Sequence, residues 1–289
     1  MFNQKLTKPR GDNLLAKKLL ISDLDGTLLD QLNGISQKYA DRLNMLLDKG
    51  IDFTIATGRD YENTKLALQN TNINNPIILT NGAIMAEYPS GSVIEYLTIP
   101  HKTVSRIYDY ANKYNLQTMV FASYDKERNY PRFVKGSWWI SGETRRLKPE
   151  EYHPYLKEHV ISIQFMNTKE KLDEMNSLTN RDPIISRDTH ILYFEDSYFP
   201  GMYWLEYNPI NARKEIMIES LRKIKGYNRE DIIVFGDNFN DVGMFQYAGT
   251  VVVVKNAHDK IKQYADRIVP SNKEGGVLKY IEQHLDELI

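Results

Sequence analysis

Two aspartates separated by one residue are the clearest chemical signal in this sequence. Asp23 and Asp25 follow a short apolar run, Leu19 to Ile21, and precede Gly26. The apolar run predicts a buried strand, and the glycine permits a tight turn directly after it. Carboxylates at the carboxyl end of a strand could supply a nucleophile with an acid/base partner, or ligands for Mg²⁺. For this motif alone, an ordinary solvated turn is the alternative.

Three further polar groups occupy comparable positions. Thr57-Gly58-Arg59 follows the apolar segment 51–56, Lys214 opens a predicted helix, and the segment 236–241 (GDNFND) follows the apolar run 232–235. Each has an ordinary alternative: a strand-ending turn, a solvated helix residue, and a loop that caps the next helix. Because ligands bind at the carboxyl ends of parallel strands, we expect the four groups to converge on one edge of a sheet.

The residue types of the four groups complement one another for phosphoryl transfer. A carboxylate such as Asp23 can attack phosphorus and form an aspartyl phosphate. Asp25 can protonate the departing alkoxide and then take a proton from the attacking water. The Thr57 hydroxyl and nearby backbone N–H groups can bind phosphoryl oxygens, while Lys214 neutralises developing charge. Mg²⁺ held by carboxylates would offset the repulsion between an anionic nucleophile and an anionic ester.

The elements that position these residues alternate between strands and helices. This alternation predicts an α/β fold with a doubly wound, mostly parallel sheet. The middle of the chain is less regular and reads as α+β, with a hairpin over 84–99, helices over 103–114 and 169–178, and β-rich segments at 117–124, 160–166, 184–186 and 190–194. The simplest organisation is a core of residues 17–86 and 200–289, an inserted smaller domain over 87–199, and a polar leader over 1–16.

Composition excludes several classes of function. The chain has 289 residues and a net charge of −1, from 37 Lys and Arg against 38 Asp and Glu, which gives no support for a nucleic-acid partner. It has no cysteine, so disulfides, zinc–thiolate sites and thiol catalysis are excluded. No apolar run is long enough to span a bilayer, and we expect no membrane partner. The expectation is a cytoplasmic protein, either a monomer or a homodimer.

The four motifs together resemble the haloacid dehalogenase-like (HAD) hydrolase superfamily. The match is closest to its Cof-type phosphatase branch, which carries a large α/β cap (class IIB) inserted between the second and third motifs. The resemblance covers the chain from about residue 17 to its end, and further segments also look like that branch: 80–83 (TNGA), 205–209 (LEYNP), 254–257 (VKNA) and 272–277 (NKEGGV). It implies a Rossmann-like core, a cap that closes over the site, and a small phosphorylated metabolite as substrate.

The resemblance also implies a role for individual residues. Asp23 would be the nucleophile and a ligand of Mg²⁺, and Asp25 the general acid/base, with its backbone carbonyl on the metal. The remaining acidic residues would complete the metal site, with Asp237 as a ligand and Asp241 as a support. The phosphoryl group would be held by the Leu24 backbone, Thr57, the Gly58 backbone, Lys214 and Asn240.

The sequence departs from the branch pattern beside the motif lysine. Glu215 stands where the branch usually has glycine, and 211–213 (NAR) replaces the commoner Gly-Val-Ser, which leaves the local turn open. In the cap, aromatic and guanidinium groups suit sugar rings or anionic tails, but cap core and solvated arginines are the alternative reading. These cap candidates are Arg128, Arg132, Trp138, Trp139, Arg145 and Arg146.

The main hypothesis is a magnesium-dependent phosphatase that acts on sugar phosphates or similar phosphomonoesters through an aspartyl-phosphate intermediate. A phosphomutase is the second, because the same carboxylate pair can move a phosphoryl group between hydroxyls. The third is a phospho-accepting regulatory module, since an acidic pocket with a lysine on a parallel sheet also suits a switch. Release of phosphate, isomerisation of a hexose phosphate, or a stable aspartyl phosphate without turnover would separate the three.

Overall fold

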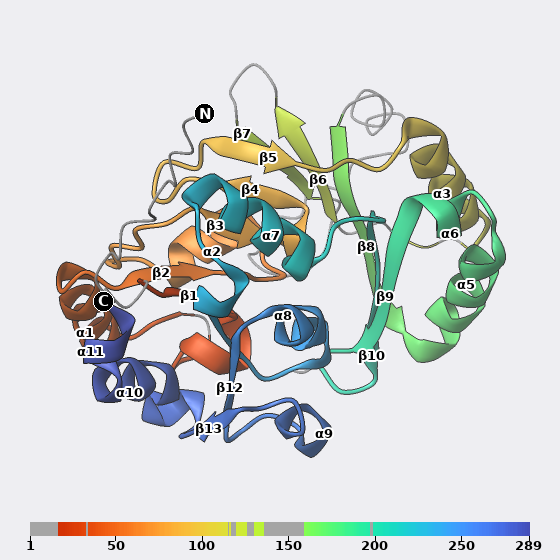
Figure 1. Cartoon of the computed structure of the whole chain (residues 1–289). Coiled ribbons are helices and arrows are strands. Elements are labelled where there is room, and N and C mark those ends of the chain that lie inside the picture. Colours follow the sequence, from red (N-terminus) through yellow and green to blue (C-terminus); the bar gives the residue numbers. More distant parts are fainter. Residues whose placement is uncertain are drawn as a thin grey trace, which may run out of the picture.

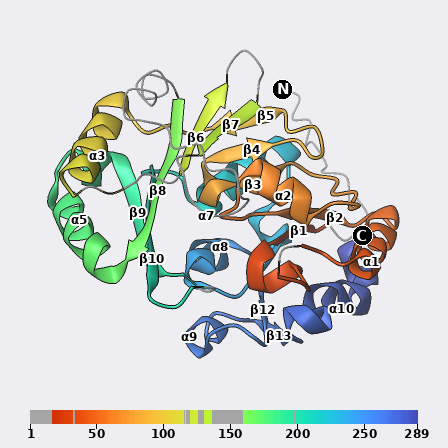
Figure 2. The ribbon, with the colours of Figure 1, turned by 180° about the vertical axis from the view of Figure 1, so that it is seen from behind.

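The computed structural model describes most of the chain, and its backbone forms two sheet-based regions that lie side by side (Figure 1). The described residues are 17–32, 34–114, 116, 120–125, 130–135, 159–196 and 199–289, with only the backbone described for 120–125, 130–135 and His159. Both ends of the described chain belong to the first region, and the second lies between them in sequence (Figure 2). The predicted α/β fold with an inserted α+β region is confirmed.

A parallel sheet forms the centre of the first region. Its strand order among the described residues is β13-β12-β11-β1-β2, and every neighbouring pair runs parallel. The strands are β1 (Leu19–Ser22), β2 (Asp52–Ile55), β11 (Ile232–Gly236), β12 (Thr250–Val254) and β13 (Arg267–Val269). Because β1 lies between β2 and β11, the sequence that follows β1 is next to the sequence that follows β11. This order brings the first and last predicted motifs to one edge.

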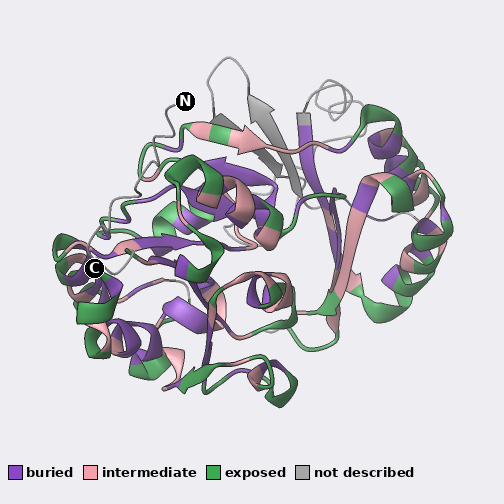
Figure 3. Ribbon diagram, viewed as in Figure 1, coloured by how far each residue is buried: buried purple, intermediate pink, exposed green. Residues whose placement is uncertain are grey.

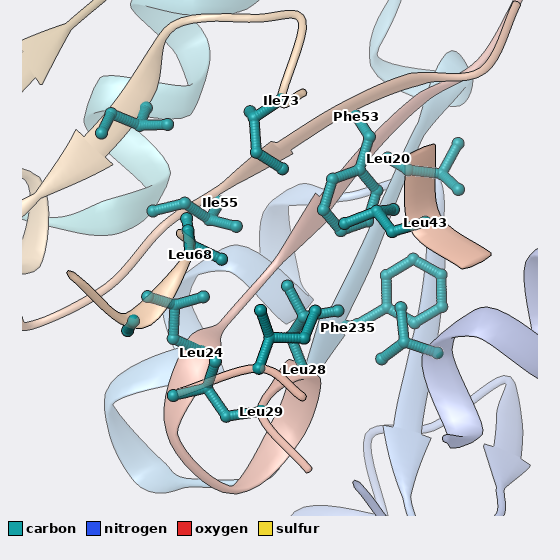
Figure 4. Close-up of a cluster of buried hydrophobic side chains, with 14 of the residues drawn as sticks. Leu20, Leu24, Leu28, Leu29, Leu43, Phe53, Ile55, Leu68, Ile73 and Phe235 are labelled. Carbon is teal, nitrogen blue, oxygen red and sulfur yellow. The ribbon is translucent and has the colours of Figure 1, made fainter. Parts of the chain in front are cut away.

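Helices cover both faces of the parallel sheet, as the continuous apolar character of its strands predicts. One face packs through Leu20 and Phe235 (Figure 4) against α1 (Gln37–Asp48), α2 (Tyr61–Ala67), α10 (Gly276–Gln283) and α11 (Leu285–Leu288). The other packs through Leu19 and Ile21 against α7 (Lys214–Lys225), α8 (Val242–Tyr247) and α9 (Asp259–Lys262). The strands are consequently buried along most of their length (Figure 3), and polar side chains gather where they end.

A second, antiparallel sheet forms the cap region. Its order among the described residues is β7-β6-β8-β10-β9, with strands β6 (Val120–Asp125), β7 (Tyr130–Lys135), β8 (His159–Thr168), β9 (Thr189–Glu195) and β10 (Met202–Pro209). The helices α3 (His101–Lys113), α5 (Lys169–Arg181) and α6 (Ile185–Asp188) lie on the outer face of this sheet (Figure 1). The opposite face of the sheet turns toward the first region (Figures 1 and 2).

A small antiparallel sheet, β3-β4-β5, continues from the parallel one. It contains β3 (Ile77–Leu79), β4 (Ile84–Ala86) and β5 (Val93–Tyr96), and the hairpin predicted over 84–99 corresponds to β4 and β5. The alternation of strands and helices in the sequence predicts a further parallel strand over 76–80. Its parallel pairing is limited to a bridge between Ala56 and Ile78, whereas the full β3 ladder is antiparallel to β4.

Some elements differ from the sequence-based expectation. The segment 184–186, predicted as β-rich, begins helix α6, because the Asp182 carboxylate accepts hydrogen bonds from the backbone N–H groups of Ile184 and Ile185 and so starts a helical turn. Strand β10, predicted to resume the core alternation, pairs antiparallel with β8 and β9 in the cap sheet. The exact domain boundaries stay a prediction. None of the helices in the described part is long and apolar enough to cross a membrane.

Candidate active site

The first acidic motif forms a tight turn at the end of β1. The Asp23 N–H donates to the Phe235 carbonyl at 2.9 Å, and the N–H of Leu29 closes the turn on the Leu24 carbonyl at 3.0 Å. Gly26 has a φ of +79°, and a Cβ atom there would lie 2.4 Å from Oδ2 of Asp237. Only glycine therefore lets the turn pass this close to the last acidic motif.

Lys214 connects two of the predicted aspartates. Its Nζ lies 2.6 Å from Oδ1 of Asp23 and 2.7 Å from Oδ1 of Asp241. The three side chains are almost fully buried, with 1 %, 7 % and 0 % of their surface exposed, respectively. Lys214 is the first residue of α7, and this helix enters the site from the face of the parallel sheet that α7 and α8 cover.

Burial changes the ionisation of these groups. It raises the pKa of Asp23 well above its ordinary value, and the Lys214 ammonium opposes that rise. Burial alone would lower the pKa of Lys214, but Asp23 and Asp241 together raise it above its ordinary value. For Asp237, burial and then the charge of Asp241 raise the pKa to about 7. The site therefore contains more carboxylates than its single buried ammonium can neutralise.

The donor set fits a hard divalent cation. One carboxylate oxygen from each of Asp23, Asp237 and Asp241 lies within 4.8 Å of the others, and Mg²⁺ prefers oxygen ligands. Thr27 Oγ1 donates to Oδ1 of Asp237 at 2.7 Å and orients that carboxylate. Asp241 is already engaged on both oxygens, because Oδ1 accepts from Lys214 and Oδ2 from the N–H groups of Asp237 and Asn238. Asp23 and Asp237 are thus better placed as ligands than Asp241.

The two aspartates of the first motif are held by different cations. Arg59 forms a bidentate pair with the Asp25 carboxylate, with Nε at 2.7 Å from Oδ2 and Nη2 at 2.6 Å from Oδ1. The Asp25 side chain is 40 % exposed, whereas that of Asp23 is buried. Asp23 therefore faces the buried lysine, and Asp25 faces the accessible side of the site.

The predicted phosphoryl-binding residues lie around the loop that follows β3. Thr57 is buried, and its Oγ1 accepts from the N–H of Arg59 at 3.1 Å, which leaves its own proton as a donor. The N–H of Asn81 donates to the Thr57 carbonyl at 2.9 Å. Asn240 Nδ2 donates to Oδ1 of Asn81 at 3.4 Å, and a Cβ on Gly58 would contact the same amide. Asn81 thus lies between two predicted phosphate-binding segments.

The backbone of this loop is strained. Thr80, Asn81 and Gly82 have φ values of +49°, +53° and +95°, a conformation that is unfavourable for a β-branched residue such as Thr80. A Cβ on Gly82 would lie 2.3 Å from the backbone oxygen of Arg213, the residue before Lys214. The loop consequently packs against the start of α7 and fixes where Lys214 begins.

Several residues that support the site were not assigned roles from the sequence. Thr27 and Arg59 lie inside predicted motifs but orient other side chains. Asn256 Nδ2 donates to the Gly26 carbonyl and Asn272 Nδ2 to the Leu29 carbonyl, both at 2.7 Å, so these residues brace the first turn. They belong to the late segments 254–257 and 272–277, where a resemblance was visible without a function. Their partners are distant in sequence, and no local pattern identifies them.

The departures beside Lys214 leave the helix intact. Helix α7 starts at Lys214 after an extended Arg213, and the Glu215 carboxylate packs against Gly243 in α8. Among the cap candidates, Arg128, Trp138, Trp139, Arg145 and Arg146 lie outside the described residues, and for Arg132 only the backbone is described. The role of each site residue stays a prediction, although the described geometry brings Asp23, Asp237, Asp241 and Lys214 together.

Comparison with known proteins places this geometry in a family. A family model described as haloacid dehalogenase-like hydrolase matches residues 20–281. A Bacillus subtilis protein named 5-amino-6-(5-phospho-D-ribitylamino)uracil phosphatase YitU is 26% identical over 275 residues, covering 92% of this chain and 97% of the relative. The pyridoxal phosphate phosphatase YbhA of Escherichia coli is 21% identical over 282 residues, covering 94% and 100% of the two chains.

Solved structures give the same result for the fold. The structure of TM0651 from Thermotoga maritima superposes with a TM-score of 0.72 at 27% identity, covering 92% of this chain and 97% of the other. A structure titled as the HAD subclass IIB sugar phosphatase BT4131 has a TM-score of 0.68 at 21% identity. The chain belongs to the haloacid dehalogenase-like hydrolases and is a phosphatase of their Cof-type, class IIB branch.

Proposed function

We propose that this protein is a magnesium-dependent phosphatase that hydrolyses small phosphorylated metabolites, such as sugar phosphates and similar phosphomonoesters, through an aspartyl-phosphate intermediate. The observation that carries the proposal is the buried Lys214, which pairs with Asp23 and Asp241 beside Asp237. The two named relatives act, by their names, on different phosphorylated metabolites. That difference supports a small phosphomonoester as the substrate class.

The two aspartates of the first motif divide the chemistry. Asp23 attacks phosphorus with the carboxylate oxygen that is not held by Lys214, and the phosphate–ester oxygen bond breaks. Asp25, on the accessible side, must leave its ion pair with Arg59 to carry a proton. It then protonates the departing alkoxide and accepts a proton from the water that hydrolyses the aspartyl phosphate. Lys214 and the hydroxyl proton of Thr57 stabilise the charge on the phosphoryl oxygens in each step.

Asp23 and Asp237 would hold Mg²⁺, with Asp241 orienting Lys214 and the backbone after β11. A bound metal ion would supply positive charge that favours the ionised form of these buried carboxylates and offsets the charge of the phosphoryl group. The surplus of carboxylates over ammonium groups supports this assignment, because a nucleophile with a raised pKa would otherwise remain protonated.

The test is release of phosphate from p-nitrophenyl phosphate with MgCl₂ and with EDTA. We expect turnover that requires the metal in the wild-type protein and none in Asp23→Asn. Absence of metal-dependent release in the intact, folded protein would refute the proposal. Positional isomerisation of a hexose phosphate without net release would instead identify a phosphomutase, and a stable aspartyl phosphate without turnover would identify a regulatory module.

A further inference from the structure

The inner face of the cap sheet carries a group of polar side chains. In β10, Leu205 and Tyr207 pack into the apolar cluster formed with α3 and α5. Because side chains alternate along a strand, Glu206 and Asn208 point to the opposite face, away from these helices. That face turns toward the parallel sheet in both views of the molecule (Figures 1 and 2). The two polar residues therefore lie between the cap and the candidate active site.

These polar groups are buried with few hydrogen bonds. Glu206 is 8% exposed and Asn208 is 0% exposed. Among the described residues, Oδ1 and Nδ2 of Asn208 make no hydrogen bond of good geometry, although the amide lies near enough to the Glu206 carboxylate to lower the pKa of that group. The buried Nδ1 of His190, the residue opposite Asn208 on β9, has no partner in this part of the chain. A buried polar group without a partner costs free energy, and native proteins generally satisfy such groups with water or a ligand. The inner face thus has unused capacity for hydrogen bonds.

One side chain connects this face to the predicted phosphoryl-binding residues. Asn81 Nδ2 donates to Oε2 of Glu206 at 3.5 Å, while Asn81 Oδ1 accepts from Nδ2 of Asn240 at 3.4 Å. Asn81 also lies against Gly58. It adopts a left-handed backbone conformation next to the strained Thr80. Strain of this kind is retained where a structure must present a particular group, as at ligand-binding sites.

We infer that Asn81, Glu206 and Asn208 form a subsite that binds the hydroxyl groups of the substrate's leaving group and so selects polyhydroxylated phosphate esters. The inference rests on the proposed function. Two amides and a carboxyl group offer donors and acceptors side by side, which matches hydroxyl groups because each of them both donates and accepts. Asn81 would contact the substrate nearest the phosphate, and Glu206 and Asn208 the hydroxyls farther along the leaving group.

The same composition disfavours two other classes of leaving group. A purely aliphatic group would leave the buried polar atoms unpaired, which a site built for hydrogen bonds rejects strongly. An anionic group would be repelled by Glu206 whenever its carboxyl is ionised. Burial raises the pKa of Glu206 to about 7, with the Asn208 amide opposing the rise, so near neutral pH this group can donate as well as accept.

The experiment compares esters that differ only in their hydroxyl groups. The pairs are D-ribitol 5-phosphate with n-pentyl phosphate, glycerol 3-phosphate with n-propyl phosphate, and glucose 6-phosphate with cyclohexylmethyl phosphate. The measured quantity is the ratio of kcat/KM for the hydroxylated ester to that for its partner, with kcat and KM determined separately. We expect a wild-type ratio above about 10 for at least one pair.

Glu206→Gln removes the charge while keeping the shape, and we expect it to lower this ratio by about 10- to 100-fold, mainly through KM. The control is Glu195→Gln, an exposed carboxylate on the neighbouring strand β9, which should leave the ratio unchanged. If the melting temperature of Glu206→Gln is far below that of the wild type, the kcat/KM ratio is measured in Asn208→Ser instead. We expect this variant to lower the ratio as well.

Two results would overturn the subsite while leaving the proposed function intact. One is a wild-type ratio near 1 for every pair, and the other is an equal loss on both members of a pair in Glu206→Gln and Asn208→Ser. Failure of the proposed function has a different signature. In that case the wild-type protein with MgCl₂ releases phosphate from none of these esters and none from p-nitrophenyl phosphate, and the subsite falls with it.

Discussion

The parallel sheet and the cap sheet place their polar residues in opposite ways. In the parallel sheet, helices cover both faces, and the charged groups Asp23, Asp237 and Lys214 lie beyond the strand ends or at a helix start. In the cap sheet, helices pack on one face, and polar residues such as Glu206 and Asn208 lie within strand β10 and project from the other face. The polar groups of the parallel sheet therefore gather at its carboxyl edge, whereas those of the cap sheet lie on one of its faces.

This difference explains how the two regions can divide the work. An edge where several strands end can bring a few groups into fixed contact, which suits a reaction centre. A sheet face presents side chains at regular spacing, and each can be exchanged without moving the strand, which suits recognition of a variable leaving group. The acidic groups at the edge are held by hydrogen bonds from Lys214 and from backbone N–H groups. Buried side-chain atoms without a partner occur in both described regions, at Thr80 beside the edge and at His190 on the cap sheet.

The largest expected effect tests whether the phosphoryl-transfer chemistry is confined to the carboxyl edge of the parallel sheet. Asp23→Asn should lower kcat by at least about 10³-fold and abolish the aspartyl phosphate, because the amide is not a nucleophile. Phosphate release and trapping of the phosphoenzyme measure both. The matched control is Asp52→Asn, at the amino end of the adjacent strand β2, where the carboxylate pairs with Lys17. Equal losses in the two variants would contradict the assignment to the carboxyl edge.

Lys214→Met tests the buried charge balance of that edge. Removing the ammonium leaves Asp23 and Asp241 buried without their partner, which should cost about 3–5 kcal/mol of unfolding free energy. Urea unfolding in EDTA measures this loss. Arg106→Gln in the cap removes a half-exposed arginine from the buried Asp182. That carboxylate keeps the hydrogen bonds from Tyr110 and from the N–H groups of Ile184 and Ile185, so this variant should lose much less. Similar losses of unfolding free energy in the two variants would mean that the buried Lys214 stabilises the fold no more than the half-exposed Arg106.

Gly82→Ala tests the junction between the two regions. The new Cβ would collide with the Arg213 backbone at a φ of +95°, so we expect a loss of about 2 kcal/mol or more, together with a displaced Lys214 and reduced kcat. Gly226→Ala is the control, since its φ is +80° but no atom of the described residues lies within 4 Å of the new Cβ. That variant should lose about 1 kcal/mol and keep its kcat. Equal stability of the two variants would argue against close packing here.

The smallest predicted effect concerns metal and pH. The pKa of Asp237, about 7 in the folded protein, exceeds its unfolded value, so the folded state binds the proton more tightly. Stability of the metal-free protein should therefore fall as pH rises from about 4 to 7. Mg²⁺ must displace this proton below pH 7, so its stabilisation should be about 2 kcal/mol smaller at pH 5.5 than at pH 8. Thermal melting with MgCl₂ and with EDTA measures the stabilisation by Mg²⁺ at each pH. A difference in melting temperature that does not change with pH would contradict the metal assignment.

The local sequence predicted the residues at the carboxyl edge of the parallel sheet better than the residues on the inner face of the cap sheet. Short apolar runs followed by Gly, Asp or Asn located the strand ends that carry Asp23 and Asp237. Strand partners are not encoded locally, so β10 was placed with the core alternation although it pairs in the cap sheet. At 184–186, β-branched residues predicted a strand, but an upstream aspartate caps a helical turn there.

The same distinction between local patterns and distant contacts applies to the residues of the candidate site. Residues that act through their own chemistry, such as Asp23 and Lys214, were identifiable because their type and position in a motif carry the information. Asn81 and Glu206 were not, because their importance depends on a contact between segments far apart in sequence, 3.5 Å in length. Thr27 and Arg59 were missed as positioning residues for a similar reason: a hydroxyl or guanidinium has no assigned partner until the fold supplies one.

The short connection from β10 to α7 has a consequence for how this protein can diverge. Glu206 and Asn208 lie on the strand that leads, through residues 210–213, directly into the helix that begins with Lys214. An insertion or deletion in this connection would shift the lysine relative to Asp23, whereas a side-chain replacement on the inner face of β10 would not. New substrate preferences should therefore arise here by substitution at constant length, which makes this strand a suitable target for saturation mutagenesis aimed at altered selectivity.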